Sequence, residues 1–99
     1  MDMKYKAIYL PIANRDIIKI DDALVNYPSK AKRIFMEMDS KVTDLEIMPY
    51  MWPVYQLKPE YRRMILEDHL LFYKIDENEH KIRIYRILYD KMDVPEHLE

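Results

Sequence analysis

The stretch HLLFYKIDENEHKIRIYRILY, residues 69–89, decides the fold of this 99-residue chain. Two apolar-rich runs flank the polar segment DENE, residues 76–79, and this arrangement predicts a β-hairpin whose turn is made without glycine. A third run of the same kind, YRRMILE at residues 61–67, precedes the hairpin. The second half of the chain therefore predicts successive antiparallel strands over 61–67, 69–76 and 80–89.

A charged residue interrupts the last of these runs. Lys81 and Arg83 alternate with apolar neighbours, which is typical of a strand with one buried side and one side facing solvent. A strict period of two then places Arg86 on the apolar side, together with Ile82, Ile84 and Leu88. The pattern leaves two roles open for Arg86, an internal ion pair and contact with a target.

The first half of the chain predicts one strand and two helices. KYKAIYL, residues 4–10, is typical of a strand that Pro11 ends, and Asn14 is a plausible N-cap for a helix that follows. Residues expected on the inner side of this helix are Ile17, Ile20, Leu24 and Tyr27. A break at Tyr27-Pro28-Ser29 leads to a second helix over about residues 30–45, with Ser29 as its cap and Phe35, Met38, Val42 and Leu45 on its inner side.

The order of these elements predicts an α+β fold. It consists of an N-terminal strand, a helical hairpin and a three- to four-stranded, mostly antiparallel sheet. Residues 47–57 contain two prolines and predict an irregular segment, with Trp52 as its packing anchor. The length predicts a single domain over residues 1–99.

Composition excludes several classes of function. The chain has no cysteine, which excludes disulfides and thiolate chemistry, and no glycine, which argues against the phosphate-binding loops that depend on it. The net charge of −2 gives no general attraction to nucleic acid. We expect a cytoplasmic protein with no cofactor, no metal site and no membrane contact, since neither an apolar run nor a signal segment stands out.

The histidines and methionines predict no special chemistry by themselves. His69, His80 and His97 lack metal-ligand spacing, so we interpret them as surface or strand-end residues, although His69 could lie on an open face of the sheet. Methionines are common core fillers. We assign that role to Met36, Met38, Met48, Met51 and Met64.

Basic residues of the strand-rich half are the stronger candidates for a site. If the strands are neighbours, several of these residues would gather around one end of the sheet, where they could bind phosphates or an acidic protein. The alternative is a solvated sheet face with internal ion pairs. The residues in question are Arg62, Arg63, Lys74, Arg83, Arg86 and Lys91.

The ordered motifs resemble the RelE/ParE family, the toxins of bacterial type II toxin–antitoxin systems. LLFYKIDENEHKIRIYRILYDKMD, residues 70–93, is similar to the family's C-terminal strand pattern hhYxhdexxxxhxIhRIhHGRRD, including its arginine at Arg86. The shared arginine implies a structural requirement at this position, such as a buried charge partner near the end of the sheet. YRRMILEDHLLFY at 61–73 and LEIMPYMWPVYQL at 45–57 resemble its upstream segments, with His69 where an aromatic residue is common. ANRDIIKI and PSKAKRIFMEMDSKVTDL, with Asp16, Pro28 and Ala31, resemble its two helices.

This chain departs from the family pattern at two places. Met51 and Trp52 stand where Gly-Arg is common, and residues 89–93, Tyr-Asp-Lys-Met-Asp, stand where His-Gly-Arg-Arg-Asp is common. A catalytic arginine of the RelE-like members falls at Leu70, and another falls at Lys91. The ParE-like members, which include plasmid stabilisation toxins and are known as DNA gyrase inhibitors, resemble this chain more.

The resemblance implies a toxin that is neutralised by a cognate antitoxin and blocks a cellular target, with DNA gyrase as the first hypothesis. The alternatives are a RelE-like mRNA endonuclease that acts on the ribosome, or a non-toxic module that only binds antitoxin. Catalytic candidates for an endonuclease are Lys91, Tyr89 and Arg86, and candidates for contact with target or phosphate are Arg62, Arg63 and Arg83. Both a homodimer and a hetero-oligomer with antitoxin remain open.

Overall fold

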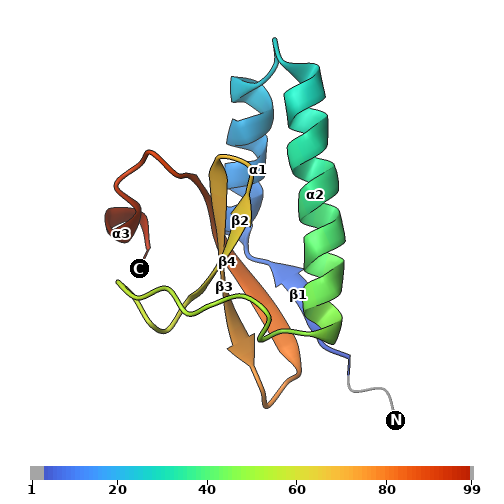
Figure 1. Cartoon of the computed structure of the whole chain (residues 1–99), viewed down its shortest axis with the longest axis vertical. Coiled ribbons are helices and arrows are strands. Elements are labelled where there is room, and N and C mark those ends of the chain that lie inside the picture. The colour runs from blue at the N-terminus through green and yellow to red at the C-terminus, as the bar shows by residue number, and fades with distance from the viewer. Residues whose placement is uncertain (1–3, 99) are drawn as a thin grey trace.

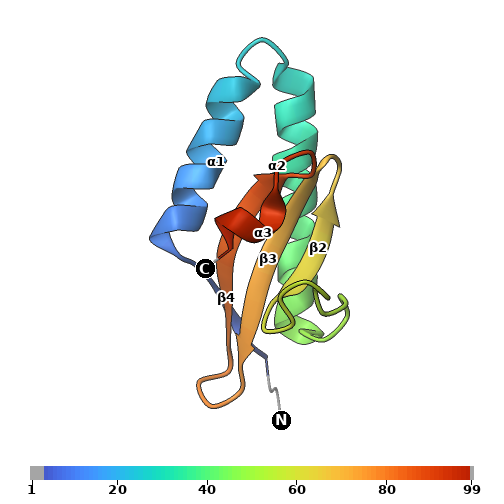
Figure 2. The same ribbon diagram turned by 90° about the vertical axis from the view of Figure 1, so that its left-hand side faces the viewer.

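A four-stranded sheet forms the centre of the computed structural model, which describes residues 4–98 (Figure 1). In the order β1-β4-β3-β2, its strands are β1 (Lys6–Tyr9), β4 (Lys81–Tyr89), β3 (His69–Asp76) and β2 (Arg62–Leu66). Helices α1 (Pro11–Ala23) and α2 (Pro28–Ile47) form a hairpin on one side of the sheet, and the short α3 (Val94–His97) lies on the other side (Figure 2). The β1–β4 pair is parallel and the other two pairs are antiparallel, which confirms the predicted fold class.

Both helices begin earlier than the sequence predicts. Helix α1 begins at Pro11 and α2 at Pro28, so neither Asn14 nor Ser29 is an N-cap. Proline suits the first position of a helix, because its fixed φ is already helical and its missing N–H would have no partner there. The backbone N–H of Asn14 instead donates to the Leu10 carbonyl at 3.1 Å, in the first turn of α1.

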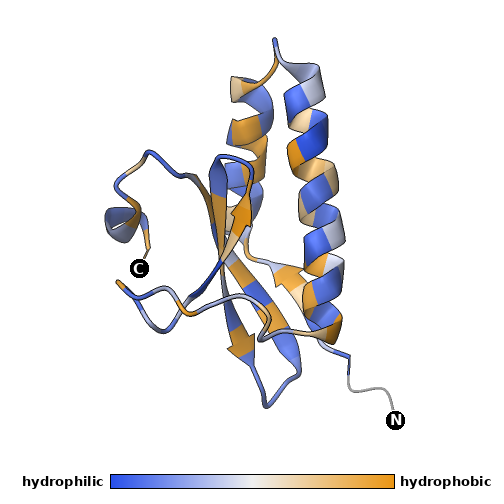
Figure 3. Cartoon of the chain, in the orientation of Figure 1, coloured by the Kyte–Doolittle hydropathy of each residue, from blue (hydrophilic) through white to orange (hydrophobic). Residues whose placement is uncertain are grey.

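The sheet separates two apolar clusters. On the helix side, the buried side chains of the sheet include Met64, Leu71, Tyr73, Ile82, Ile84 and Ile87. On the other side, the irregular segment and the C-terminal residues cover the sheet through Tyr55, Tyr61, Phe72, Leu88, Val94 and Leu98. Apolar and polar residues alternate along both helices, as an amphipathic hairpin requires (Figure 3).

Some of the residues predicted to be buried are exposed. Met38 and Met64 are buried as predicted, whereas Met36, Met48 and Met51 are 62%, 59% and 46% exposed. Tyr27 is also exposed, because it lies at the tip of the helical hairpin, which extends beyond the sheet (Figure 1). Trp52 packs against the helix-side cluster, in agreement with its predicted role as an anchor.

A β-bulge explains the interruption at Arg86. Phe72 pairs with Arg86 and Tyr73 pairs with Ile84, so Tyr85 is an extra residue in β4. Beyond it the alternation reverses, and Ile87 packs on the helix side while Leu88 packs on the other side. Arg86 therefore does not share a face with Ile82 and Ile84, and the strict period of two was wrong at this point.

Arg86 has a buried charge partner in α1, Asp16. Its Nε and Nη2 donate to the two carboxylate oxygens of Asp16 at 2.8 and 3.0 Å, and its Nη1 donates to the His97 carbonyl at 2.8 Å. Asp16, only 4% exposed, also accepts the backbone N–H of Ile87 at 2.9 Å. The hydrogen bonds to Asp16 raise the pKa of Arg86 above its usual value, against the opposing effect of burial.

We predict that Asp16→Ala lowers the free energy of unfolding by about 3–5 kcal/mol, because it leaves Arg86 as a partly buried charge without its partner. Urea denaturation of the purified protein measures this change. Asp22→Ala is the matched control, since Asp22 lies exposed on the same helix. Equal unfolding free energies for the two variants would show that the ion pair does not stabilise the fold.

Candidate functional site

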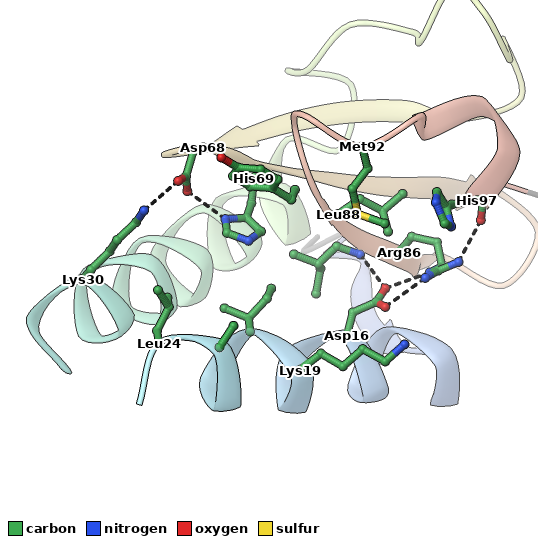
Figure 4. Close-up of a pocket in the computed structure, with 14 residues that line it drawn as sticks. Asp16, Lys19, Leu24, Lys30, Asp68, His69, Arg86, Leu88, Met92 and His97 are labelled. Carbon is green, nitrogen blue, oxygen red and sulfur yellow. Dashed lines mark hydrogen bonds and ion pairs between the residues drawn. The ribbon is translucent and has the colours of Figure 1, made fainter. Parts of the chain in front are cut away.

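A groove of about 430 Å³ separates α1 from the end of the sheet (Figure 4). We call this cavity the hairpin groove. Its apolar walls come from two parts of the chain. One wall consists of Ile20 and Ala23 of α1 with Leu24 just after it, and the other consists of Leu88, Tyr89 and Met92 from the end of β4 and the segment after it. An apolar segment bound in the groove would therefore contact apolar side chains on two sides.

The groove exists because β1 is shorter than β4. Strand β1 ends where Tyr9 pairs with Ile84, and α1 then continues beside the edge of β4 without forming a strand. The N–H of Asp90 donates to the Asp68 carbonyl at 2.9 Å, which shows which residues of β4 direct their peptide groups toward β3. Because this direction alternates along an antiparallel pair, the peptide groups of Ile87 and Tyr89 point away from β3, toward the edge that β1 leaves uncovered. Two of these groups already have partners. Asp16 accepts the N–H of Ile87, and the Tyr89 carbonyl accepts the N–H of Met92 at 3.1 Å.

A polar corner closes one end of the groove. The β2–β3 turn contains Glu67, whose φ of 55° lies in the left-handed region without the help of glycine. Two residues of α2 hold this turn through ion pairs, Arg33 with Glu67 at 3.1 Å and Lys30 with Asp68 at 2.7 Å. The turn places Asp68 and His69 at the groove, with Asp68 Oδ1 2.9 Å from His69 Nδ1 (Figure 4).

The contacts of Asp68 keep its carboxylate ionised. Burial acts to raise the pKa of Asp68, but the hydrogen bonds from Lys30 and His69 outweigh it and hold that pKa below its usual value. The hydrogen bond to Asp68 also raises the pKa of the Lys30 ammonium. The corner is thus a fixed arrangement of a cation, a carboxylate and an imidazole.

The charged residues that line the groove leave one cation in excess. Asp16 is paired with Arg86, and Asp68 is paired with Lys30. Lys19 is exposed, and among residues 4–98 it makes no ion pair or hydrogen bond. Its ammonium is available to an acidic group of a bound molecule.

The predicted catalytic candidates have different surroundings. Tyr89 is 42% exposed and lines the groove, and Lys91 is exposed in the turn that follows β4. Arg86 is engaged by Asp16 and by the His97 carbonyl. Its contacts are those of a residue that holds α1, β4 and the C-terminal segment together.

The other basic residues are not gathered at one end of the sheet. Arg62 donates to the Trp52 carbonyl at 2.7 Å and lies over the Tyr50 ring. Arg63 lies over Tyr55, on the side of the second cluster, and Arg83 pairs with Asp76 at the far end of the β3–β4 hairpin. The predicted basic cluster is therefore dispersed, and internal contacts account for its arginines.

Sequence reasoning missed part of the groove. His69 opens β3 as predicted, but it is buried, at 8% exposure, on the helix side of the sheet instead of on a surface or an open face. Lys19, Lys30 and Asp68 gave no signal, because they lie on three separate segments that only the packing of the hairpin brings together. The adjacent residues Asp68 and His69 are the one feature of the sequence that points to a polar site in this region.

Two further features of the described residues limit the kinds of site. Within residues 4–98, no three His, Asp or Glu side chains are grouped so that they could hold a metal ion. No helix in this range has the length and apolar character needed to cross a membrane.

Comparison with known proteins identifies the family. The family model described as the ParE toxin of the type II toxin–antitoxin system parDE matches residues 7–94. No curated protein sequence matches the chain. The fold is similar to a chain of the chromosomal ParDE toxin–antitoxin system from P. aeruginosa, with a TM-score of 0.71 and 20% identity over 88% of this chain and 97% of that one.

A second solved structure has the same fold. A chain of the toxin–antitoxin complex RelBE2 from Mycobacterium tuberculosis gives a TM-score of 0.63 and 17% identity over 87% of this chain and 98% of that one. At these identities the structures support the fold, while the family match extends over most of the described residues. The chain belongs to the ParE toxin family of type II toxin–antitoxin systems.

Proposed function

We propose that this chain is the toxin of a toxin–antitoxin pair, that it inhibits DNA gyrase by binding, and that a cognate antitoxin neutralises it. The observation that carries the proposal is the match of the ParE toxin family over residues 7–94. Both structural neighbours come from toxin–antitoxin systems, which supports an antitoxin as the partner of this chain.

The hairpin groove is the proposed antitoxin surface. It offers apolar walls and an uncovered strand edge, which suit an apolar segment of a partner that orders when it binds. The excess charge of Lys19 favours a segment that also carries acidic residues. These features fit an antitoxin tail of alternating apolar and acidic character.

The proposed target surface is the exposed segment Tyr89–Lys91. Its side chains are not needed for the core, unlike that of Arg86, which holds three elements together. Inhibition by binding requires a complementary surface and no catalytic group. The candidates for an endonuclease are Lys91, Arg86, Tyr89, Arg62 and Arg63. Internal contacts engage the three arginines and hold Arg62 and Arg63 away from Tyr89 and Lys91, which disfavours that alternative.

We predict that induced expression in bacteria stops growth and triggers DNA-damage signalling, and that the purified protein inhibits DNA supercoiling by purified gyrase. The control is co-expression with the antitoxin encoded beside it, which should restore growth. Unchanged gyrase activity, together with cleavage of mRNA on purified ribosomes, would support the RelE-like endonuclease instead. Normal growth with intact antitoxin binding would support a non-toxic binding module.

A charge reversal tests the target surface. Lys91→Glu should relieve growth inhibition at least tenfold with an unchanged melting temperature, since Lys91 is exposed and makes no contact that stabilises the described fold. Lys6→Glu is the control, because Lys6 is exposed on β1 and pairs with the opposite end of β4. Equal toxicity of the two variants would remove Tyr89–Lys91 from the target surface.

A bulky substitution tests the antitoxin surface. Ala23→Arg places a long side chain in the hairpin groove from an exposed position of α1, so we predict at least a tenfold weaker affinity for the antitoxin with little change in stability. Ile18→Arg, at a position that is 60% exposed on α1 and outside the groove, is the matched control. Isothermal titration calorimetry measures both affinities, and equal values would place the antitoxin elsewhere.

A further inference from the structure

His69 is a buried polar side chain that presents an unused nitrogen to the hairpin groove. The residue is 8% exposed, and its ring lies between the Asp68 carboxylate and the groove (Figure 4). Its Nδ1 is 2.9 Å from Asp68 Oδ1, while Nε2 has no hydrogen-bond partner among residues 4–98. Because His69 lines the groove, Nε2 can form a hydrogen bond with a molecule bound there.

The surroundings fix how His69 can bind. The Asp68 carboxylate accepts a hydrogen bond from His69 Nδ1–H, and Lys30 in turn donates to Asp68 at 2.7 Å. The Tyr89 ring packs against the imidazole, with 5.6 Å between the ring centres. Because Nδ1 keeps its proton, Nε2 decides the chemistry. It accepts a hydrogen bond from a donor when the ring is neutral, and it donates to a carboxylate when the ring is protonated.

The charges around the groove favour a carboxylate. Every titratable or charged residue that faces it belongs to α1, α2, the β2–β3 turn, the end of β4 or the C-terminal segment. These residues are Asp16, Lys19, Lys30, Asp68, Arg86, Tyr89 and His97. Three of them are cations and two are carboxylates, and each carboxylate is already paired. A protonated His69 would add a further positive charge, which a carboxylate of a bound segment neutralises.

We propose that His69 is the specificity residue of the hairpin groove and that its Nε2 binds a carboxylate of the antitoxin segment seated there. The inference rests on the proposed function, because it takes the antitoxin as the occupant. Since the carboxylate pairs with the protonated ring, the complex binds a proton at His69 as it forms. The affinity of the chain for the antitoxin therefore increases when the pH falls from 8 to 6.

The test measures antitoxin affinity at pH 6 and pH 8, with the full chain and the full-length antitoxin encoded beside it. Wild-type protein should bind about tenfold more tightly at pH 6, the effect of about one charge-assisted hydrogen bond. His69→Phe keeps an aromatic ring in the same place and should abolish the difference between the two pH values. His69→Gln, which keeps a polar group but cannot become charged, should abolish it as well, so a folding defect in one variant does not decide the result.

Two other histidines provide matched controls. His97→Gln alters the second histidine that lines the groove, and His80→Gln alters one outside it, so both should keep the tenfold difference. A single antitoxin Asp or Glu, replaced by its amide, should abolish the difference in the wild-type toxin and change nothing further in His69→Phe. A wild-type affinity that is independent of pH, that is tighter at pH 8, or whose pH dependence survives in both His69 variants overturns the inference while the proposed function stands. No binding at either pH overturns both.

Discussion

The contact between Asp16 and Arg86 joins the parts of this fold that the sheet alone does not. Arg86 donates two hydrogen bonds to the Asp16 carboxylate and a third to the His97 carbonyl, and Asp16 also accepts the Ile87 N–H. Helix α1, the end of β4 and the C-terminal segment thus meet at one ion pair. A buried pair of this kind contributes little net stability over an apolar substitute, but removing one partner is costly. Its greater effect here is to fix how the helical hairpin sits on the sheet.

Charged side chains of the hairpin also take the place of missing strands. Glu46 of α2 accepts the N–H of Ala7 on the outer edge of β1, and Lys41 of α2 donates to the Ile65 carbonyl on the outer edge of β2. Asp16 does the same for Ile87 where β1 has ended. Unpaired strand edges invite association with other chains. The hairpin therefore protects three places on the sheet edges. On the stretch of β4 next to the groove, the bond from Ile87 to Asp16 is the only contact of this kind within residues 4–98.

The fold could be predicted from the sequence wherever a short pattern determines it. The alternation around Ile82 and Ile84 and the polar turn after Asp76 are local signals, and they gave the β3–β4 hairpin. The bulge at Tyr85 could not be predicted, because it is a feature of the pairing of β4 with β3 and leaves no local pattern in the sequence. The groove could not be predicted for a related reason. Its polar corner depends on the ion pair between Lys30 of α2 and Asp68 of the β2–β3 turn, two residues that are far apart in the sequence.

The position of Tyr89 connects the two proposed surfaces. Its ring lines the hairpin groove and packs against His69, yet it is also the first residue of the exposed segment that ends at Lys91. A segment seated in the groove would cover one face of this ring and lie beside Lys91. In the proposed function, antitoxin and target would then compete for neighbouring atoms, and neutralisation would need no change in the shape of the toxin. The ion pair of Asp16 and Arg86, together with the hydrogen bond from Ile87 to Asp16, joins the end of β4 to α1 beside the groove, which favours binding to a preformed surface.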